Sequence, residues 1–114
     1  MNIKKHLSEP WFTLVMLGLK TVEGRLNKGS FKELDVGNII TFYNDDAIYR
    51  EFNVKVTKIT KHNNFETYLR KETLTKCLPG YTRIKDGVEV YYKYFSKEDE
   101  EKYKIKAFTL ELVN

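Results

Sequence analysis

Apolar residues near the start of the chain follow a helical period. Trp11, Leu14, Val15 and Gly18 stand at positions i, i+3, i+4 and i+7, which predicts a short and mostly buried helix that ends near Leu19. A glycine at the end of such a helix readily takes the left-handed conformation that terminates it. The residues before this helix are compatible with an edge strand or with a tail.

Polar residues and a proline mark the start of this helix. Ser8 is the expected N-cap, with Glu9 near the positive end of the helix and Pro10 in the first turn, where its missing N–H costs nothing. Trp11 has two interpretations, a core side chain or a ring that stacks on a base at the mouth of a cavity. An aromatic side chain on an apolar face usually belongs to the core, so the core interpretation is favoured.

From position 21 the pattern changes to the alternation of a strand. One face of this strand carries Thr21, Glu23 and Arg25, and the opposite face is apolar or small. Lys20 lies at the bend between the helix and the strand, so alternation does not fix its direction. The sequence therefore places two cationic residues and one anionic residue, Lys20, Arg25 and Glu23, at one corner of the fold.

Two further strands are expected in the middle of the chain. A strand over residues 39–43 is followed by a turn over residues 44–46, since Asn and Asp tolerate turn conformations. The strand after this turn alternates apolar and polar positions through Val56. Ile59 breaks the alternation, which predicts a bulge near Lys58. Residues 27–30, which follow the strand of Glu23, are expected to be a turn or loop.

The second half of the chain combines helical signals with a final strand. Asn63 is the expected N-cap of a helix, with Glu66 at the reciprocal capping position. Ser96 and Asp99 have the spacing of another capped helix start, and the acidic run over residues 98–101 is interpreted as a solvated helix face. A strand over residues 107–113 closes the chain. The whole pattern predicts an α+β fold, a mixed sheet or partly closed barrel with short helices at its ends.

Length and composition predict one domain spanning residues 1–114. A chain of 114 residues can bury a single core, and its shares of 41% hydrophobic and 32% charged residues suit a packed globule. No apolar run approaches the roughly 20 residues of a membrane span, and no signal-peptide core is present. The single Cys77 cannot form an internal disulfide, so a cytoplasmic setting is expected. The net charge of +4 only weakly favours a polyanionic partner, because Lys and Arg are spread along the chain.

Several familiar chemistries have no motif in this sequence. There is no P-loop, no G-x-G-x-x-G and no G-x-S-x-G. His6, His62 and Cys77 are too few and too scattered for a recognisable zinc site, so neither a metal nor a cofactor is expected. Cys77 is interpreted as a small buried thiol rather than a nucleophile.

The candidate site residues are Lys20, Glu23 and Arg25. Arg25 offers a planar fork suited to phosphate or carboxylate, and a lysine in a dry cleft can act as a base. Glu23 could relay a proton or hold the lysine as a charged donor. The trio is therefore either a polar pocket for a nucleotide or an internal ion-pair network that fixes the corner.

Tyrosines form a second group of candidates. Residues 86–95 have helical spacing, and the tyrosines at 91, 92 and 94 cannot all face the core. Base stacking on an exposed tyrosine contributes about 1–3 kcal/mol. Tyr94 is the candidate for a ring that faces the cleft.

These segments together resemble one known family. Gly18-x-Lys20-x-x-Glu23-x-Arg25 matches the G-x-K-x-x-E-x-R signature of the ASCH family, a PUA-like β-barrel group. Residues 35–42 resemble the V-G-D-x-I-x-F strand entry of that family, and residues 94–103 resemble its Tyr-rich, acidic segment. Two departures are Asn38 in place of the usual Asp, and Lys104 where a Gly normally follows the Tyr.

The resemblance implies a PUA-like fold and a cleft lined by the signature residues. Members of the family are expected to bind RNA or a modified nucleotide there, which makes Lys20, Glu23, Arg25, Tyr94 and Trp11 the candidate ligand contacts. A non-catalytic adaptor domain is a further alternative.

The resemblance also implies an enzymatic alternative. Some small members are amidohydrolases that deacylate N4-acetylcytidine with a Lys, a Thr and a more distant Glu. Lys20 matches the Lys and would act as the base, but Glu23 stands where these enzymes carry the Thr. Glu66 and Glu72 are the candidates for the distant Glu.

Overall fold

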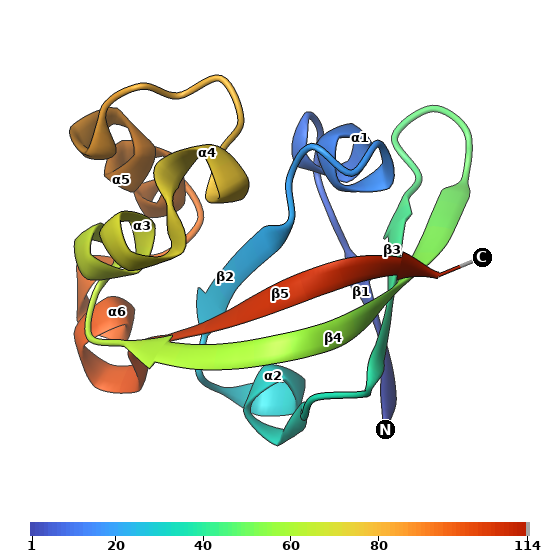
Figure 1. Cartoon of the computed structure of the whole chain (residues 1–114), viewed down its shortest axis with the longest axis horizontal. Helices are drawn as coiled ribbons and strands as arrows, with labels where there is room; N and C mark the ends of the chain where they lie inside the picture. Colours follow the sequence, from blue (N-terminus) through green and yellow to red (C-terminus); the bar gives the residue numbers. More distant parts are fainter. Residues whose placement is uncertain (114) are drawn as a thin grey trace.

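The fold is built on a curled sheet of five strands (Figure 1). The computed structural model describes residues 1–113. The sheet order is β1-β3-β4-β5-β2; β1 runs parallel to β3, and the other neighbours are antiparallel. The mixed sheet forms a half-barrel, which confirms the predicted α+β class. The strands are β1 Asn2–His6, β2 Val22–Leu26, β3 Ile39–Asn44, β4 Arg50–His62 and β5 Ile105–Val113.

Six short helices pack with this sheet in the part of the chain that the structure describes. Four of them, α3 to α6, lie between β4 and β5 in the chain and form one lobe beside the sheet (Figure 1). None of the helices within residues 1–113 is long and apolar enough to cross a membrane. The helices are α1 Trp11–Met16, α2 Gly29–Glu33, α3 Phe65–Glu72, α4 Leu74–Cys77, α5 Ile84–Tyr92 and α6 Lys97–Tyr103.

One hydrophobic core joins the sheet to the lobe. Phe42, Val54 and Phe108 are fully buried on the sheet, and Phe65 and Tyr68 of α3 are fully buried with them. Burial of whole aromatic side chains contributes roughly 1.5–3 kcal/mol each relative to exposure, so this contact fixes the lobe on the sheet.

Local sequence signals placed most strands correctly. The residues before α1, for which the sequence allowed an edge strand or a tail, form the edge strand β1, and Gly18 ends the α1 segment with a φ of +76°. The register of β4 against β5 shifts between Val56 and Lys58, as the broken alternation predicted. The Ser96 hydroxyl caps α6 by accepting a hydrogen bond from the N–H of Asp99 at 3.1 Å.

Two predicted helix caps are wrong. Pro10, not Ser8, occupies the N-cap position of α1, and the start of the helix is held by Glu9, whose carboxylate accepts from the N–H of Thr13 at 2.9 Å. Asn64, not Asn63, caps α3 by accepting from the N–H of Thr67. Glu66 is therefore one position short of the reciprocal capping site.

The acidic run of α6 is not wholly solvated, contrary to expectation. Glu100 is buried, and its carboxylate accepts from the N–H of Phe65 at 2.8 Å and from the hydroxyl of Tyr92 at 2.7 Å. A charged acceptor at the start of α3 satisfies a backbone donor there. Glu100 thus ties α6 to α3 and α5.

The turn or loop predicted over residues 27–30 overlaps the start of the short helix α2, which begins at Gly29. Its C-terminal carbonyls accept hydrogen bonds from the Lys106 ammonium, at 2.9 Å from Phe31 O, 3.0 Å from Lys32 O and 2.7 Å from Leu34 O. Cations stabilise helix C-termini, so a lysine of distant β5 supports a helix of only five residues.

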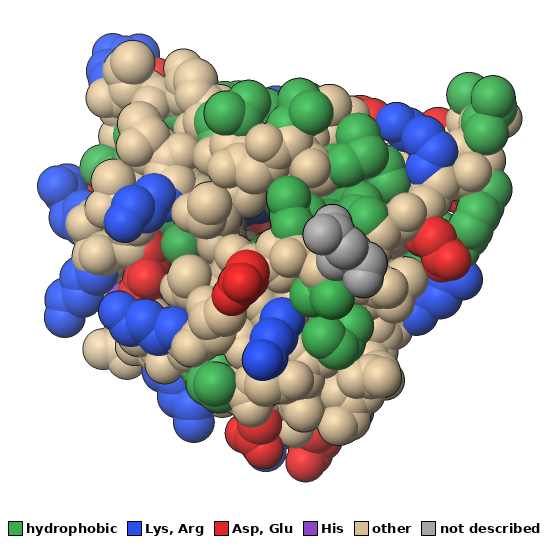
Figure 2. Space-filling view, turned by 45° about the vertical axis from the view of Figure 1, so that its right-hand side comes forward, with side chains coloured by type: hydrophobic (Ala, Val, Ile, Leu, Met, Phe, Trp, Pro, Cys, Tyr) green, Lys and Arg blue, Asp and Glu red, His purple; other side chains and the backbone are tan. Residues whose placement is uncertain are grey.

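Hydrophobic side chains also gather on part of the surface. Figure 2 shows green side chains gathered on one face of the molecule. Gly18, which follows α1, lies close to the side chain of Leu112 in β5. Leu17, Leu19 and Leu112 are between 45% and 62% exposed.

Candidate functional site

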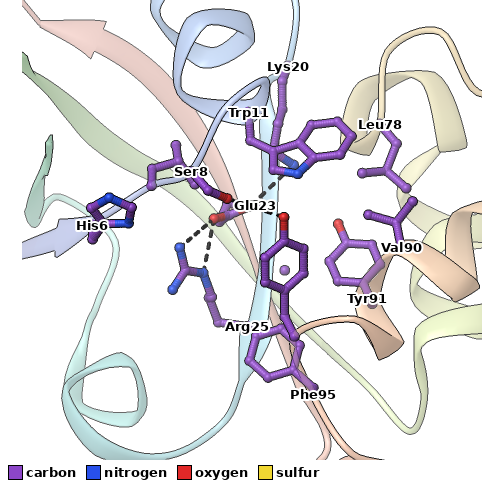
Figure 3. Close-up of a pocket in the computed structure, with 13 residues that line it drawn as sticks. His6, Ser8, Trp11, Lys20, Glu23, Arg25, Leu78, Val90, Tyr91 and Phe95 are labelled. Carbon is purple, nitrogen blue, oxygen red and sulfur yellow. Dashed lines mark hydrogen bonds and ion pairs between the residues drawn. The ribbon is translucent and has the colours of Figure 1, made fainter. Parts of the chain in front are cut away.

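A pocket of about 470 Å³ opens between the two edge strands of the sheet. The end of β1 and the residues that follow it form one wall, β2 forms the floor, and α5 with the connections on both sides of it forms the other wall (Figure 3). This volume lies in the range of about 300–1,000 Å³ that is typical of small-molecule sites. All five candidate residues, Trp11, Lys20, Glu23, Arg25 and Tyr94, line this one pocket.

Lys20 is buried at the base of the pocket. Its ammonium donates to the carbonyl oxygens of Val22 at 2.6 Å and Cys77 at 2.5 Å, and lies 3.2 Å from Oε1 of Glu23. An ammonium has three N–H donors and no acceptor. Each of its N–H groups therefore has an oxygen partner within the protein.

Glu23 lies between the two cations of the site. Its Oε2 accepts a hydrogen bond from Nε of Arg25 at 3.0 Å and forms an ion pair with Nη2 at 2.9 Å, whereas Oε1 faces Lys20 (Figure 3). Burial raises the pKa of Glu23, but the charges and hydrogen bonds of Lys20 and Arg25 outweigh it, so the pKa lies below its ordinary value. Glu23 is therefore an ionised carboxylate that can only accept hydrogen bonds.

Arg25 keeps part of its donor capacity. A guanidinium has five N–H donors, and Glu23 accepts one hydrogen bond from Nε and pairs with the charge at Nη2. About four donors therefore remain uncommitted within residues 1–113. The plane of Arg25 is held over the ring of Phe31, with Cζ 4.9 Å from the ring centroid. The side chain is 20% exposed, so solvent and ligand can reach it.

Aromatic side chains line the rest of the pocket. Trp11 is 9% exposed, and Figure 3 shows its ring against the pocket, so it is both a core residue and part of the lining. Tyr94 is 53% exposed, and its hydroxyl lies 3.2 Å from Oγ of Ser8. This contact joins the two walls of the pocket at their outer edge. Ser8 thus bonds across the pocket instead of capping α1.

Two further lining residues are Gly24, which was not predicted from the sequence, and Tyr91, which belonged to the candidate tyrosines although Tyr94 was chosen as the ring that faces the cleft. Tyr91 is buried, and its hydroxyl lies 2.9 Å from that of Tyr68. Gly24 sits on the floor between Glu23 and Arg25, beneath Tyr68. A glycine between two charged motif residues was the available signal, since a strand interior tolerates Gly where another group approaches closely.

The candidates for a distant catalytic glutamate lie outside the pocket. Glu72 accepts from Thr60 Oγ1 at 2.6 Å and pairs with Nε2 of His62 at 2.7 Å, and Glu66 pairs with Arg70 on the surface of α3. Within residues 1–113, Glu23 is the one carboxylate in the lining. Burial raises the pKa of Glu72, but the hydrogen bonds of Thr60 and His62 outweigh it and leave the pKa lowered, so Glu72 is a structural anion.

One group of side chains has the spacing of metal ligands. His6, Asp45 and Asp46 offer ligand atoms within 4.8 Å of one another, and all three residues are exposed. His6 also lines the pocket, and its Nε2 lies 3.7 Å from Asp45. Cys77 and His62 are separate from this group among the described residues.

A curled mixed sheet with a pocket between its edge strands defines a PUA-like half-barrel. The ASCH domain profile matches residues 6–113, and the chain belongs to the ASCH domain family. The crystal structure of hypothetical protein PH0355 is 32% identical, with a TM-score of 0.90 over 99% of this chain and 100% of that one.

Two further solved structures are similar. The solution structure of PF0455 from Pyrococcus furiosus is 31% identical, with a TM-score of 0.81 over 100% of this chain and 99% of the other. The crystal structure of the ZmASCH S128A mutant from Zymomonas mobilis is 17% identical, with a TM-score of 0.66 over 97% and 72%, a likeness of fold. No curated protein matches the chain.

Proposed function

We propose that this protein binds a nucleotide, free or within single-stranded RNA, in the pocket between β1 and β2. The observation that carries the proposal is the pairing of Glu23 with two cations. Lys20, Glu23 and Arg25 leave one net positive charge in the pocket, and Arg25 holds the uncommitted donors. Planar guanidinium donors match the geometry of phosphate oxygens.

The other lining groups suit a base and its sugar. Trp11 and Tyr94 offer ring faces or edges, and stacking on such rings contributes about 1–3 kcal/mol per base. Oε1 of Glu23 accepts only from Lys20 among the described residues, so it keeps a lone pair for a ligand N–H. A base with an exocyclic amine would meet that lone pair.

The geometry favours binding over hydrolysis. As a base or nucleophile Lys20 would need a free lone pair, but its three N–H groups are directed at Val22 O, Cys77 O and Glu23. No second carboxylate lines the pocket within residues 1–113. The role of Lys20 in this proposal is to keep Glu23 ionised and to hold its carboxylate in place.

Binding of the four ribonucleoside 5′-monophosphates and of a mixed-sequence RNA hexamer tests the proposal. We expect binding by the parent protein that weakens with salt, because ion release accompanies phosphate contacts. Arg25→Ala should weaken binding at least tenfold. Arg70→Ala is the matched control, since Arg70 is a surface arginine in an exposed pair with Glu66. A parent protein that binds none of these ligands contradicts the proposal and favours an adaptor domain.

A chromatographic assay separates the enzymatic alternative. The protein and a folded Lys20→Ala variant are incubated with N4-acetylcytidine, and cytidine is measured. We expect no release from either. Release by the parent and not by the variant would make the protein an amidohydrolase, and circular dichroism of the variant shows whether it is folded.

A further inference from the structure

Two buried tyrosine hydroxyls form a pair that ends in the pocket. Tyr68 is fully buried in α3, whereas Tyr91 of α5 is 5% exposed and lines the pocket. Their oxygens are 2.9 Å apart. Two phenols carry two protons, and only one proton lies between the two oxygens, so the second must be directed elsewhere.

The surroundings decide the direction of this hydrogen bond. If Tyr91 donated to Tyr68, the Tyr68 proton would be left to the neighbouring Cys77 thiol, whose sulfur is a weak acceptor. If Tyr68 donates to Tyr91, its proton meets a good oxygen acceptor. The second arrangement satisfies the more deeply buried hydroxyl, and it turns the Tyr91 proton toward the pocket.

Packing fixes the orientation of the Tyr91 ring. The ring stacks on Phe65, with centroids 4.7 Å apart and an interplanar angle of 14°, and meets Tyr68 edge to face at 5.5 Å. Burial also raises the pKa of both phenols well above the ordinary value. Tyr91 is thus a rigid, neutral donor, and a rigid donor loses little side-chain freedom when a ligand binds.

We propose that Tyr91 donates a hydrogen bond to a carbonyl oxygen or ring nitrogen of the bound base, and that Tyr68 is the positioning residue that turns the Tyr91 proton toward the pocket. This inference rests on the proposed nucleotide binding and assigns the base-reading contact within it. Arg25 then holds the phosphate, and Glu23 and Tyr91 offer the base one acceptor and one donor.

Two ligands separate a base contact from a phosphate contact. The probe is whichever ribonucleoside 5′-monophosphate binds the parent protein best, and ribose 5-phosphate has the same sugar and phosphate without a base. We expect Tyr91→Phe to weaken the nucleotide by about fivefold, the loss of one net hydrogen bond, and to leave ribose 5-phosphate unchanged. Arg25→Ala should weaken both ligands. Calorimetry or NMR titration measures the affinities.

Tyr92→Phe is the matched control for this experiment. Tyr92 is the next residue of α5, and its hydroxyl donates to Glu100, away from the pocket lining. Its replacement should leave both affinities unchanged. Thermal unfolding of each variant confirms that the protein is folded under the binding conditions.

A double-mutant cycle tests the role of Tyr68. Tyr68→Phe should weaken nucleotide binding about twofold in the parent, and it should have no effect in the Tyr91→Phe background. An equal loss in both backgrounds would show that Tyr68 acts through packing alone and would overturn the positioning role.

The outcomes distinguish this inference from the proposed function. Loss of binding in Arg25→Ala with none in Tyr91→Phe overturns the inference and leaves nucleotide binding intact. An equal loss of nucleotide and ribose 5-phosphate in Tyr91→Phe assigns Tyr91 to the sugar or phosphate and also overturns it. A parent protein that binds none of the four nucleotides overturns both.

Discussion

The ring of Tyr68 packs directly against the backbone of Gly24, and it leaves no room for a side chain at position 24. A Cβ on Gly24 would lie 2.7 Å from the hydroxyl oxygen of Tyr68 and would overlap its ring. The strand that carries Glu23 and Arg25 therefore depends on α3 of the helical lobe. The absence of a side chain at position 24 allows this contact.

Gly24→Ala should destabilise the protein by about 1–3 kcal/mol, because overpacking forces a buried ring to move. Chemical denaturation measures the loss. In a Tyr68→Val background the obstructing ring is gone, so the cost of Gly24→Ala should largely disappear. An equal cost in both backgrounds would show that the ring is not the cause.

Glu23→Gln should destabilise the protein at neutral pH by about 3–5 kcal/mol, because Lys20 is left buried without its counter-charge. The stability of the variant should also depend less on pH in the acid range than that of the parent. Since the pKa of Glu23 is lowered on folding from its value of 4.5, its ionisation stabilises the fold above about pH 4.5, and this stability is lost as pH falls below that value.

Thermal unfolding between pH 3 and pH 7 measures this difference. The Tm of the parent should fall more steeply below pH 4.5 than that of Glu23→Gln. Glu66→Gln is the control, because its exposed pair with Arg70 contributes little. Identical acid profiles for the parent and Glu23→Gln would contradict an ionised Glu23.

Lys104→Gly should stabilise the protein. Lys104 has φ of 64° and ψ of −178°, a conformation that is costly for any residue with a Cβ. Relief of this strain, offset by the greater freedom of glycine in the unfolded chain, should raise stability by about 1 kcal/mol.

The control for this prediction lies two residues earlier. Lys102→Gly falls within α6 and should lower stability by about 1 kcal/mol, the usual cost of glycine in a helix. If both substitutions destabilise equally, the strain at Lys104 is absent. Melting temperatures of the two variants provide the comparison.

Cys77 should be unreactive in the folded protein. Burial raises the pKa of its thiol to about 11, so little thiolate exists at pH 8. Ellman's reagent should label Cys77 only after denaturation. A cysteine placed at exposed Thr75 of α4 by Thr75→Cys should react within minutes, and labelling of native Cys77 at a similar rate would contradict the prediction.

Predictions from the sequence succeeded where neighbouring residues determine the structure. Alternation and a single phase break located β4 and its bulge, and Ser96 was identified as a cap from its own segment. The short helix α2 was missed because Lys106, far along the chain, satisfies its carbonyls. Burial of Glu100 was missed for the same reason, since its partner is the N–H of Phe65.

The candidate site also contains residues that a local motif could identify and residues that it could not. Lys20, Glu23 and Arg25 are close in sequence, so a motif could identify them together, and the structure brings Trp11 and Tyr94 to the same pocket. The remaining walls come from segments tens of residues away. No local pattern at Ser8 or Tyr91 could show which side chains they face, because those contacts exist only in the folded chain.

The gap between the two edge strands of the sheet has a consequence for stability. β1 and β2 are the two edges of the half-barrel, and they do not pair with each other. A ligand that contacts both walls would act as a removable bridge across this gap. Binding would raise the free energy of unfolding of the domain by RT ln(1 + [L]/Kd). The bound ligand would thus connect the two edge strands that the backbone leaves unpaired.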